Sequence, residues 1–561
     1  MHSNTTHCLY TAVTGLLLTT GAHAFPMIAL PANPITTWTP IADTGYSAPD
    51  KYTPAGNVSK FIGFTPPVIL QTGTAPPQIA FKGQMDSTFL PVTTANDEGI
   101  WTNTDPKFWA SPTPFVSRMV VQEGDLASAV QIGDSASKSM LVQALQTTFT
   151  GATLFTTNST ASPLVPNFSV YEGGSPIGLA GFGVAGFSNG ARAVSDGQRI
   201  AAWASIGAPA RTRYWDVFPP LIAVAHTLSP FGTWPSAPPA PNVLCSPAIS
   251  EYGAVAHRAR SGAPWFRQDY IEADPISPSG LFPAGIQVVR RNDLAVAGER
   301  FGVFHPNLMA IAGGPNVQPT VAWQMNNMYT DKFAGPNVLG VPILGSNSLW
   351  CWRLASTLTP YAEIARVGQA APDIAPRTFK SFHSLHLVDD QTTWGDADVF
   401  YGVILDTNTY AIYTRHITTV ALVTTLSVPQ LIATDDPAGP VSQYVPAIYP
   451  GTWPIAKLFR WFSVDPRGNV LIKATLGGGV PAAQKQCLIA AMTATNHAME
   501  MRTQSGPTFS LPTPTHGIQN IANFAITNPE QGPLGRGQAI AGPNIGVQVF
   551  FPGGNGIFIG Q

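Results

Sequence analysis

Residues 459–476 read FRWFSVDPRGNVLIKATL, and this stretch decides the fold class. Apolar and polar residues alternate on both sides of Asp465-Pro466-Arg467-Gly468-Asn469, which combines the residue types that turn a chain sharply. Proline presets the backbone angle of a turn, glycine adopts conformations that other residues avoid, and aspartate or asparagine bonds to the backbone of the turn itself. The stretch therefore predicts an antiparallel β-hairpin.

The same pattern recurs in three other segments, residues 285–314, 399–426 and 547–560. β-Branched and aromatic residues, which fit a pleated and half-buried surface, dominate them. We therefore predict a mainly β fold of antiparallel, hairpin-rich domains that resemble sandwiches or jelly rolls and contain few short helices. A β-propeller is the alternative, because the hairpins from about residue 190 onward recur, though irregularly, at intervals similar to those of propeller blades.

Glycine and proline leave little room for long helices. The 561 residues include 52 glycines and 53 prolines, and proline lacks the backbone donor that a helix interior needs. Apolar residues recur at helical spacing in two segments, residues 135–149 and 481–502, and Pro481 stands at a suitable first position of the second. The sequence therefore predicts a helix near 481–502.

Two proline-rich stretches, residues 229–247 and 368–377, suggest domain boundaries. The predicted units are an extended or irregular N-terminal arm over 1–115 and β-rich domains over 116–235, 248–370 and 378–561, the last of which carries the helix near 481–502.

Charged side chains are scarce. Lysine and arginine number 29 and aspartate and glutamate 31, so the net charge is −2 and only 11% of the residues are charged, against about 25% in a typical protein. The first lysine is Lys51 and the first arginine is Arg118. Without a basic arm or cluster, we expect no sequence-specific binding of nucleic acid. Such a surface packs readily against copies of itself, because few ions lose water at the contact.

Residues 1–24 carry part of the pattern of a secretory signal peptide. Residues 8–21 form a short apolar run and Ala22-His23-Ala24 matches a cleavage site, but the basic residues that usually precede such a run are missing. The run is too short to span a bilayer as a helix, so we expect no transmembrane segment. The four cysteines are far apart and form no C-x-x-C pair, which speaks against structural zinc and against a dense disulfide framework.

Ser188 is the one candidate nucleophile. It stands in Gly186-Phe187-Ser188-Asn189-Gly190, which resembles the G-x-S-x-G elbow of α/β-hydrolases over about a dozen residues. That elbow needs a strand before the serine and a helix after it. Glycines crowd the upstream segment and Gly197 interrupts the downstream one, so a glycine-rich turn is the preferred interpretation. An overlapping G-x-G-x-x-G over 181–186 lacks the helix and the acidic residue of a dinucleotide site.

Three other motifs are interpreted as structural. Asp43-Thr44-Gly45 matches the triplet of aspartic proteases, but no suitable second triplet follows, so a turn is expected. His383 and His386 would face opposite sides of a strand and could not bind one metal ion together. Asp396 and Asp398 form an i, i+2 carboxylate pair without the spacing of an EF-hand. The sequence therefore assigns no catalytic, cofactor-binding or metal-binding residue and implies no cofactor.

These observations favour a structural protein that assembles with copies of itself and with other shell proteins. A viral capsid, an outer shell or a surface layer fits the low charge, the hairpins and the long N-terminal segment, and would place the chain in a virion. The alternative is a secreted or cell-surface β-propeller or sandwich that binds a partner, exported by a signal peptide over 1–24. A serine hydrolase that uses Ser188 is the second alternative.

Overall fold

The structure is a computed structural model, which describes most residues between 286 and 560, residues 37–48, 59–70 and 78–102 in large part, and chiefly strands between 118 and 274. The described chain consists almost entirely of strands in antiparallel sheets. Within it the one helical element is a single 3₁₀ turn, η3 (Ala482–Gln484). The predicted mainly β, antiparallel and hairpin-rich fold is confirmed. No helix in the described residues is long and apolar enough to cross a membrane.

The first half of the chain forms three large sheets and a hairpin. The β2–β6 sheet contains β2 (Phe61–Phe64), β3 (Val68–Leu70), β4 (Gln78–Met85), β5 (Glu98–Thr102) and β6 (Arg118–Gln122). A hairpin of β7 (Thr153–Asn158) and β8 (Asn167–Glu172) precedes the β9–β12 sheet, with β9 (Val184–Phe187), β10 (Ala201–Ile206), β11 (Arg211–Asp216) and β12 (Ile222–His226). The β13–β17 sheet contains β13 (Pro241–Leu244), β14 (Ala248–Ile249), β15 (Val255–Ser261), β16 (Gln268–Asp274) and β17 (Ile286–Arg290).

The middle of the chain adds two large sheets and a small one. The small sheet contains β18 (Leu294–Val296), β19 (Glu299–Phe301) and β22 (Met328–Thr330). The β20–β24 sheet contains β20 (Phe304–Gly314), β21 (Val317–Met325), β23 (Ser348–Arg353) and β24 (Tyr361–Arg366). The β25–β29 sheet contains β25 (Phe379–Asp389), β26 (Ala397–Leu405), β27 (Tyr410–Val420), β28 (Val423–Leu426) and β29 (Gln430–Thr434).

The C-terminal part adds the β30–β34 sheet and a sheet that includes the first strand of the chain. The β30–β34 sheet contains β30 (Gln443–Tyr444), β31 (Trp453–Val464), β32 (Val470–Leu476), β33 (Gln486–Thr493) and β34 (Asn496–Arg502). After the hairpin of β35 (Ser510–Thr513) and β36 (Gly517–Asn520), the closing sheet combines β1 (Trp38–Asp43) with β37 (Asn523–Ala525), β38 (Ile540–Ala541), β39 (Asn544–Phe551) and β40 (Gly554–Gly560).

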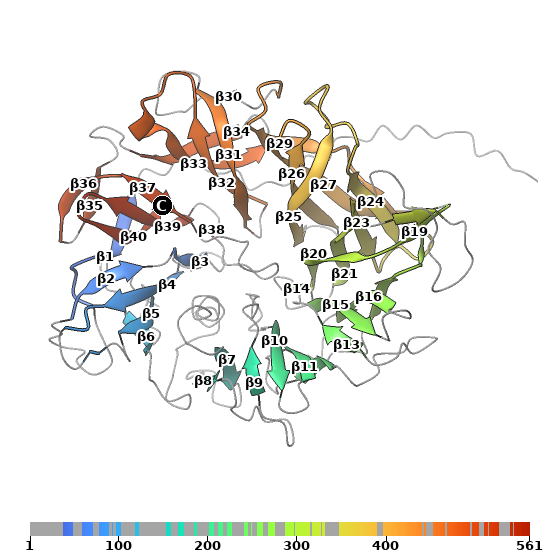
Figure 1. The fold of residues 1–561 in the computed structure, drawn as a ribbon, viewed down its shortest axis with the longest axis horizontal. Helices are drawn as coiled ribbons and strands as arrows, with labels where there is room; N and C mark the ends of the chain where they lie inside the picture. Colours follow the sequence, from blue (N-terminus) through green and yellow to red (C-terminus); the bar gives the residue numbers. More distant parts are fainter. Residues whose placement is uncertain are drawn as a thin grey trace, which may run out of the picture.

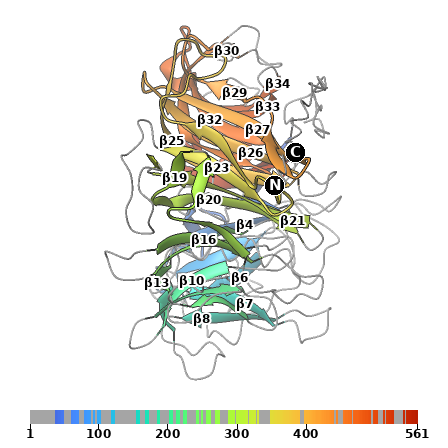
Figure 2. The same ribbon diagram turned by 90° about the vertical axis from the view of Figure 1, so that its right-hand side faces the viewer.

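The large sheets follow one another around a ring in the order of the sequence (Figure 1), and Figure 2 shows the same ring from the side. Neighbouring sheets pack face to face, as in a sandwich, with apolar side chains between them. One cluster joins the β20–β24 and β25–β29 sheets, a second joins the β25–β29 and β30–β34 sheets, and a third joins the β30–β34 sheet to the closing sheet. This ring order is the arrangement of the β-propeller alternative.

The hairpin that decided the fold class forms as predicted. β31 and β32 pair antiparallel on either side of a turn between Asp465 and Asn469. The carboxylate of Asp465 accepts the Asn469 backbone N–H at 2.7 Å and the Asn469 side-chain amide at 2.7 Å. Gly468 has a φ of +81°, a conformation that residues with a Cβ rarely adopt. A turn that is stabilised by residues within five positions of one another can therefore be predicted from the sequence.

The helix predicted near 481–502 is wrong. Beyond the short η3, this segment forms β33 and β34, which pair antiparallel with each other and with β32. Cys487, Leu488 and Ile489 are consecutive and all buried, because both faces of β33 meet apolar neighbours. A strand buried on two faces reads as a continuous apolar run, which spacing alone does not distinguish from a buried helix. The other helical segment, residues 135–149, lies outside the described residues.

The predicted boundaries at 115, 235–248 and 370–378 stay predictions. The segment 1–115, expected as an extended or irregular arm, contributes strands β1 to β5 to the described ring. Cys351 and Cys487, the cysteines within the described residues, are buried and form no disulfide; their thiols donate to the carbonyls of Ala362 and Ala474.

The ring closes where the two ends of the described chain meet. β1 pairs antiparallel with β40, from Trp38 opposite Gly560 to Asp43 opposite Gly556. The buried carboxylate of Asp43 accepts the Thr515 backbone N–H at 3.0 Å and its hydroxyl at 2.7 Å, and lies 3.2 Å from Nδ1 of His516. One carboxylate oxygen thus ties the N-terminal strand to the loop before β36.

We predict that Asp43→Ala destabilises the protein by about 1–3 kcal/mol, because it removes the buried carboxylate that accepts the Thr515 backbone N–H and hydroxyl. The free energy of unfolding in denaturant measures the loss. Asp406→Ala, which removes an exposed aspartate bonded to Thr378, is the matched control and should change stability little. Equal unfolding midpoints for the two variants would contradict a role for Asp43 in closing the ring.

Candidate functional site

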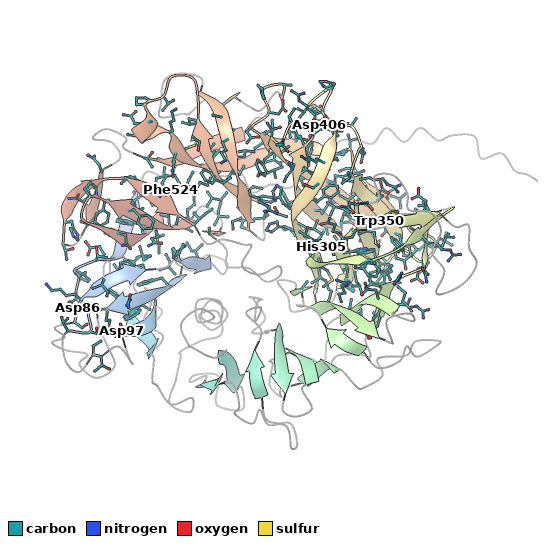
Figure 3. All side chains as sticks on the ribbon, in the orientation of Figure 1. Asp86, Asp97, His305, Trp350, Asp406 and Phe524 are labelled. Carbon is teal, nitrogen blue, oxygen red and sulfur yellow. The ribbon has the colours of Figure 1, made fainter. Side chains whose placement is uncertain are left out.

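Four ionisable side chains gather where the β20–β24 sheet meets the β25–β29 sheet, in a protein with few charges. They are called the ionic cluster here: Arg353 at the end of β23, Asp396 and Asp398 at the start of β26, and His416 in β27. Figure 3 shows the side chains that fill the space between these sheets, with Trp350 labelled in the first of them and Asp406 in the second. In this cluster, ionisable side chains from two different sheets contact one another, with a histidine between two carboxylates.

Strand register brings these residues together. Asp398 lies directly opposite His416 in the β26–β27 ladder, and its Oδ1 is 2.9 Å from His416 Nδ1. Asp396, two residues earlier and on the same face, accepts a hydrogen bond of 2.8 Å from Arg353 Nη1 and lies 3.8 Å from His416 Nε2. The imidazole therefore sits between two carboxylates, one of which also holds a buried guanidinium.

The electrostatics of the cluster follow from this geometry. Hydrogen bonds to Asp396 and Asp398 raise the pKa of His416 to about 9. Burial alone would raise the pKa of Asp396, but hydrogen bonds from His416, Arg353 and Thr418 hold this pKa below its usual value. At neutral pH the group therefore contains two carboxylates and two cations. His416 and Arg353 supply the positive charge that a calcium ion would bring to an i, i+2 carboxylate pair.

This charge balance limits the chemistry of the ionic cluster. A histidine that is already protonated cannot act as a general base at neutral pH, since a base must hold a free lone pair. The described residues contain no group of three or more histidine, cysteine, aspartate or glutamate side chains that could hold a metal ion. The arrangement can, however, fix two segments of backbone relative to each other.

The cluster fixes the loop after β23 to the hairpin of β27 and β28. Arg353 Nη1 also donates to the carbonyl of Ile417 at 2.9 Å, and the hydroxyls of Ser356 and Thr419 are 2.9 Å apart. Farther out, the carbonyl of Leu422 accepts the backbone N–H of Leu358 at 3.0 Å. Two loops from different sheets are thus joined into one rigid surface.

That surface ends in exposed aliphatic side chains. Leu358 is 71% exposed, Val420 50% and Leu422 49%, and these three residues are called the apolar tip. Val428, beyond the end of β28, is 82% exposed. The segments that carry the tip, residues 354–360 and 417–428, contain no charged residue. Single exposed aliphatic residues are normal, but several side by side mark a contact surface.

The turn that carries the tip has an unusual backbone. Val420 pairs with Val423 across a two-residue turn, and the turn residues Ala421 and Leu422 have φ values of 49° and 65°. Turns with two positive φ angles normally use Asn-Gly, because a Cβ in the left-handed region costs about 1–2 kcal/mol per residue. The chain therefore places a leucine outward at a position where asparagine or glycine would be more stable.

Ser188 lies outside the described residues, but the strands around it are described. β9 ends at Phe187, and β9 and β10 are antiparallel neighbours in one sheet. A nucleophile elbow joins a strand of a largely parallel sheet to a helix. The flanking strands therefore do not provide the setting of an α/β-hydrolase, and the glycine-rich turn itself stays a prediction.

The remaining sequence motifs are separate in the structure. His383 is buried in β25, where burial lowers the pKa of its imidazole to about 3, and its Nδ1 lies 2.9 Å from the Ser384 hydroxyl. The His386 ring instead contacts Phe462 of the β30–β34 sheet, with ring centroids 4.8 Å apart. Asp43 begins a turn, as expected, in which its carbonyl accepts the Tyr46 N–H at 3.1 Å.

Sequence reasoning missed Arg353, His416 and the apolar tip. Asp396 and Asp398 stood out as a carboxylate pair, but their cationic partners lie 43 residues before and 18 residues after them in the chain. The run TTVALVTTLSV over 418–428 reads as strand throughout, and the absence of a turn residue at 421–422 concealed the hairpin.

Comparison with known proteins finds no family model that matches the chain and no curated protein that resembles it in sequence. Three solved structures are similar at low scores: the polysaccharide lyase Uly1, an α-L-arabinanase of Penicillium chrysogenum complexed with arabinobiose, and a sialidase of Trypanosoma rangeli in complex with the inhibitor DANA. The lyase has a TM-score of 0.31 and 9% identity, over 94% of this chain and 100% of its own.

The other two structures are no more similar. The arabinanase has a TM-score of 0.23 and 11% identity over 59% of this chain and 96% of its own. The sialidase has a TM-score of 0.22 and 8% identity over 94% of this chain and 96% of its own. Scores this low establish neither a shared fold nor a shared activity.

We predict that the His416 imidazole titrates with a pKa of about 9, measured by NMR of its ring protons. Asp398→Asn should lower this pKa toward the ordinary value of about 6.5, because one carboxylate partner is lost, while Asp406→Asn should leave it unchanged. A histidine with a raised pKa contributes stability that is fully present below pH 6.5 and is lost as the pH rises through about 9. A pKa of His416 near 6.5 in the unmodified protein would refute the arrangement.

We predict that Leu422→Asn raises the free energy of unfolding by about 1 kcal/mol, because asparagine tolerates a positive φ better than leucine does. Denaturant unfolding measures the gain. Val420→Asn is the control in the same hairpin, since Val420 is equally exposed but has no positive φ, and it should give no gain. A loss of stability in Leu422→Asn would show that the turn is not strained.

Proposed function

We propose that this protein is a structural component that associates with copies of itself. One observation carries the proposal: several of the described charges form ion pairs that are buried or half-buried in the molecule, while aliphatic side chains remain outside. This pattern makes a surface that loses little hydration energy when it is buried against another copy.

The internal pairing of charges is extensive. Arg258 and Asp269 form a buried ion pair of 2.7 Å, and Arg377 donates to the fully buried Asp436 at 2.9 Å. Arg366 binds both Glu299, at 2.7 Å, and Glu363. Together with Arg353, Asp396 and Asp398 of the ionic cluster, these pairs account for ten of the 60 charged residues of the chain.

The exposed aliphatic residues complete the pattern. Among the described residues, seven large aliphatic side chains are exposed: Ile62, Leu294, Val296, Leu358, Val420, Leu422 and Val428. A shell or surface layer buries such residues between subunits. A virion, the location expected for a capsid or outer-shell protein, remains part of this proposal, as do other shell proteins as partners.

A secreted or cell-surface binding protein is the second candidate. The ring order of the sheets in Figure 1 favours it, since β-propellers commonly present binding surfaces on such a frame. Export through a signal peptide over 1–24 belongs to this candidate, and a mature protein that starts at Phe25 would support it.

Electron microscopy and sedimentation of the purified full-length chain test the main proposal. We expect discrete shells, sheets or filaments, or at least a concentration-dependent increase in mass, because self-association follows mass action. A protein that stays monomeric at every concentration reached would overturn the proposal and leave the binding protein as the candidate.

A further inference from the structure

We propose that the apolar tip, Leu358, Val420 and Leu422, is a contact between two copies of this chain. This inference rests on the proposed self-association and names the surface responsible. The tip joins two sheets, since Leu358 lies in the loop between β23 and β24 and the other two residues lie in the hairpin between β27 and β28.

The first argument is the strained backbone. Leu422 has a φ of 65°, which is unfavourable for a residue with a Cβ. Its side chain is half exposed, so burial in the core does not offset that cost. Strain of this kind is retained where it serves a function. An aliphatic side chain directed into solvent becomes favourable only when a second surface covers it.

The second argument is rigidity. The Leu422 carbonyl accepts the N–H groups of Leu358 and Thr359 at 3.0 and 3.4 Å. The Thr359 carbonyl accepts the Thr424 N–H at 2.9 Å, and the Thr424 hydroxyl donates to the Pro360 carbonyl at 2.9 Å. A tip that is already ordered loses little entropy when a partner binds.

The third argument identifies the partner. The tip segments carry no charged residue, and threonines are frequent beside the aliphatic residues in the sequence. Arg415, near the base of the hairpin, bonds to the carbonyls of Ser427 at 2.7 Å and Ile364 at 2.6 Å. A tip that inserts into an anionic membrane normally has basic residues around it. An uncharged aliphatic tip is instead complementary to an identical surface, and a net charge of −2 over 561 residues opposes the approach of a second copy very little.

A charge-swap experiment on the full-length chain tests this contact. In a symmetric contact whose two-fold axis passes beside Leu358, Leu358→Glu faces a second Leu358→Glu, so each of the variants Leu358→Glu and Leu358→Lys should dissociate when alone. An equimolar mixture of the two should recover association, because opposite charges then face each other. Sedimentation velocity measures all three samples, and circular dichroism verifies that each variant is folded.

A milder variant guards against loss of folding. Leu422→Asn suits the backbone of the turn and removes the aliphatic side chain, so it should weaken self-association about tenfold or more. Asp406→Asn is the control, since Asp406 is exposed but lies in the turn between β26 and β27, at the opposite end of β27 from the tip. This control should change the association constant less than about twofold, within the spread of ordinary surface substitutions.

The outcomes separate the two proposals. If the unmodified protein is monomeric, the proposed function fails and this contact fails with it. If the unmodified protein associates and both Leu422→Asn and Leu358→Glu associate equally well, the tip is not the contact and only this inference is overturned.

Discussion

The faces of the sheets are the constraint on which the rest of the structure depends. The large sheets whose side chains are described present apolar residues to their neighbours, and strands such as β33 and β23 are buried on both faces. The described residues provide no long helix to cover a sheet, so every sheet requires another sheet on each side. A row of sheets would expose two apolar ends, whereas a ring exposes none. The pairing of β1 with β40 completes the ring, and the buried carboxylate of Asp43 holds that junction from one side.

Features that act over a few residues could be predicted from the sequence. The Asp465–Asn469 turn, the hairpin of β26 and β27 within 399–426, the hairpin over 547–560 and the strands over 285–314 are present as expected, because turn residues and alternation specify them locally. The helix near 481–502 was mispredicted for a physical reason: burial on two faces removes the alternation that distinguishes a strand. Among the strands within residues 1–115, β1 was missed because its partner β40 lies hundreds of residues away, whereas β2 to β5 pair with strands close to them in the sequence.

The candidate site illustrates the same limit more sharply. Asp396 and Asp398 were visible as a pair, and the pattern was consistent with a cation between them. The cation proved to be part of the protein, because strand register places His416 opposite Asp398 and sheet packing brings Arg353 to Asp396. Strand register and sheet packing depend on residues far apart in the sequence, so the spacing of residues in one motif does not predict them. The raised pKa of His416 is a consequence of that meeting rather than of any local motif.

The ionic cluster and the apolar tip have a common structural logic. Charges that pair beneath the surface hold the two loops in place, and the same pairing removes those charges from the surface that the loops present. A leucine in a left-handed conformation would relax or be replaced if the turn served only to connect two strands, since asparagine or glycine meets that need at lower energy. Its presence at the outermost point of a hairpin that a salt-bridged base makes rigid is therefore best explained by what the side chain contacts outside the molecule. On this proposal, Arg353 holds the two loops together beneath the surface, and the unfavourable backbone conformation at Leu422 keeps an uncharged side chain exposed on top of them.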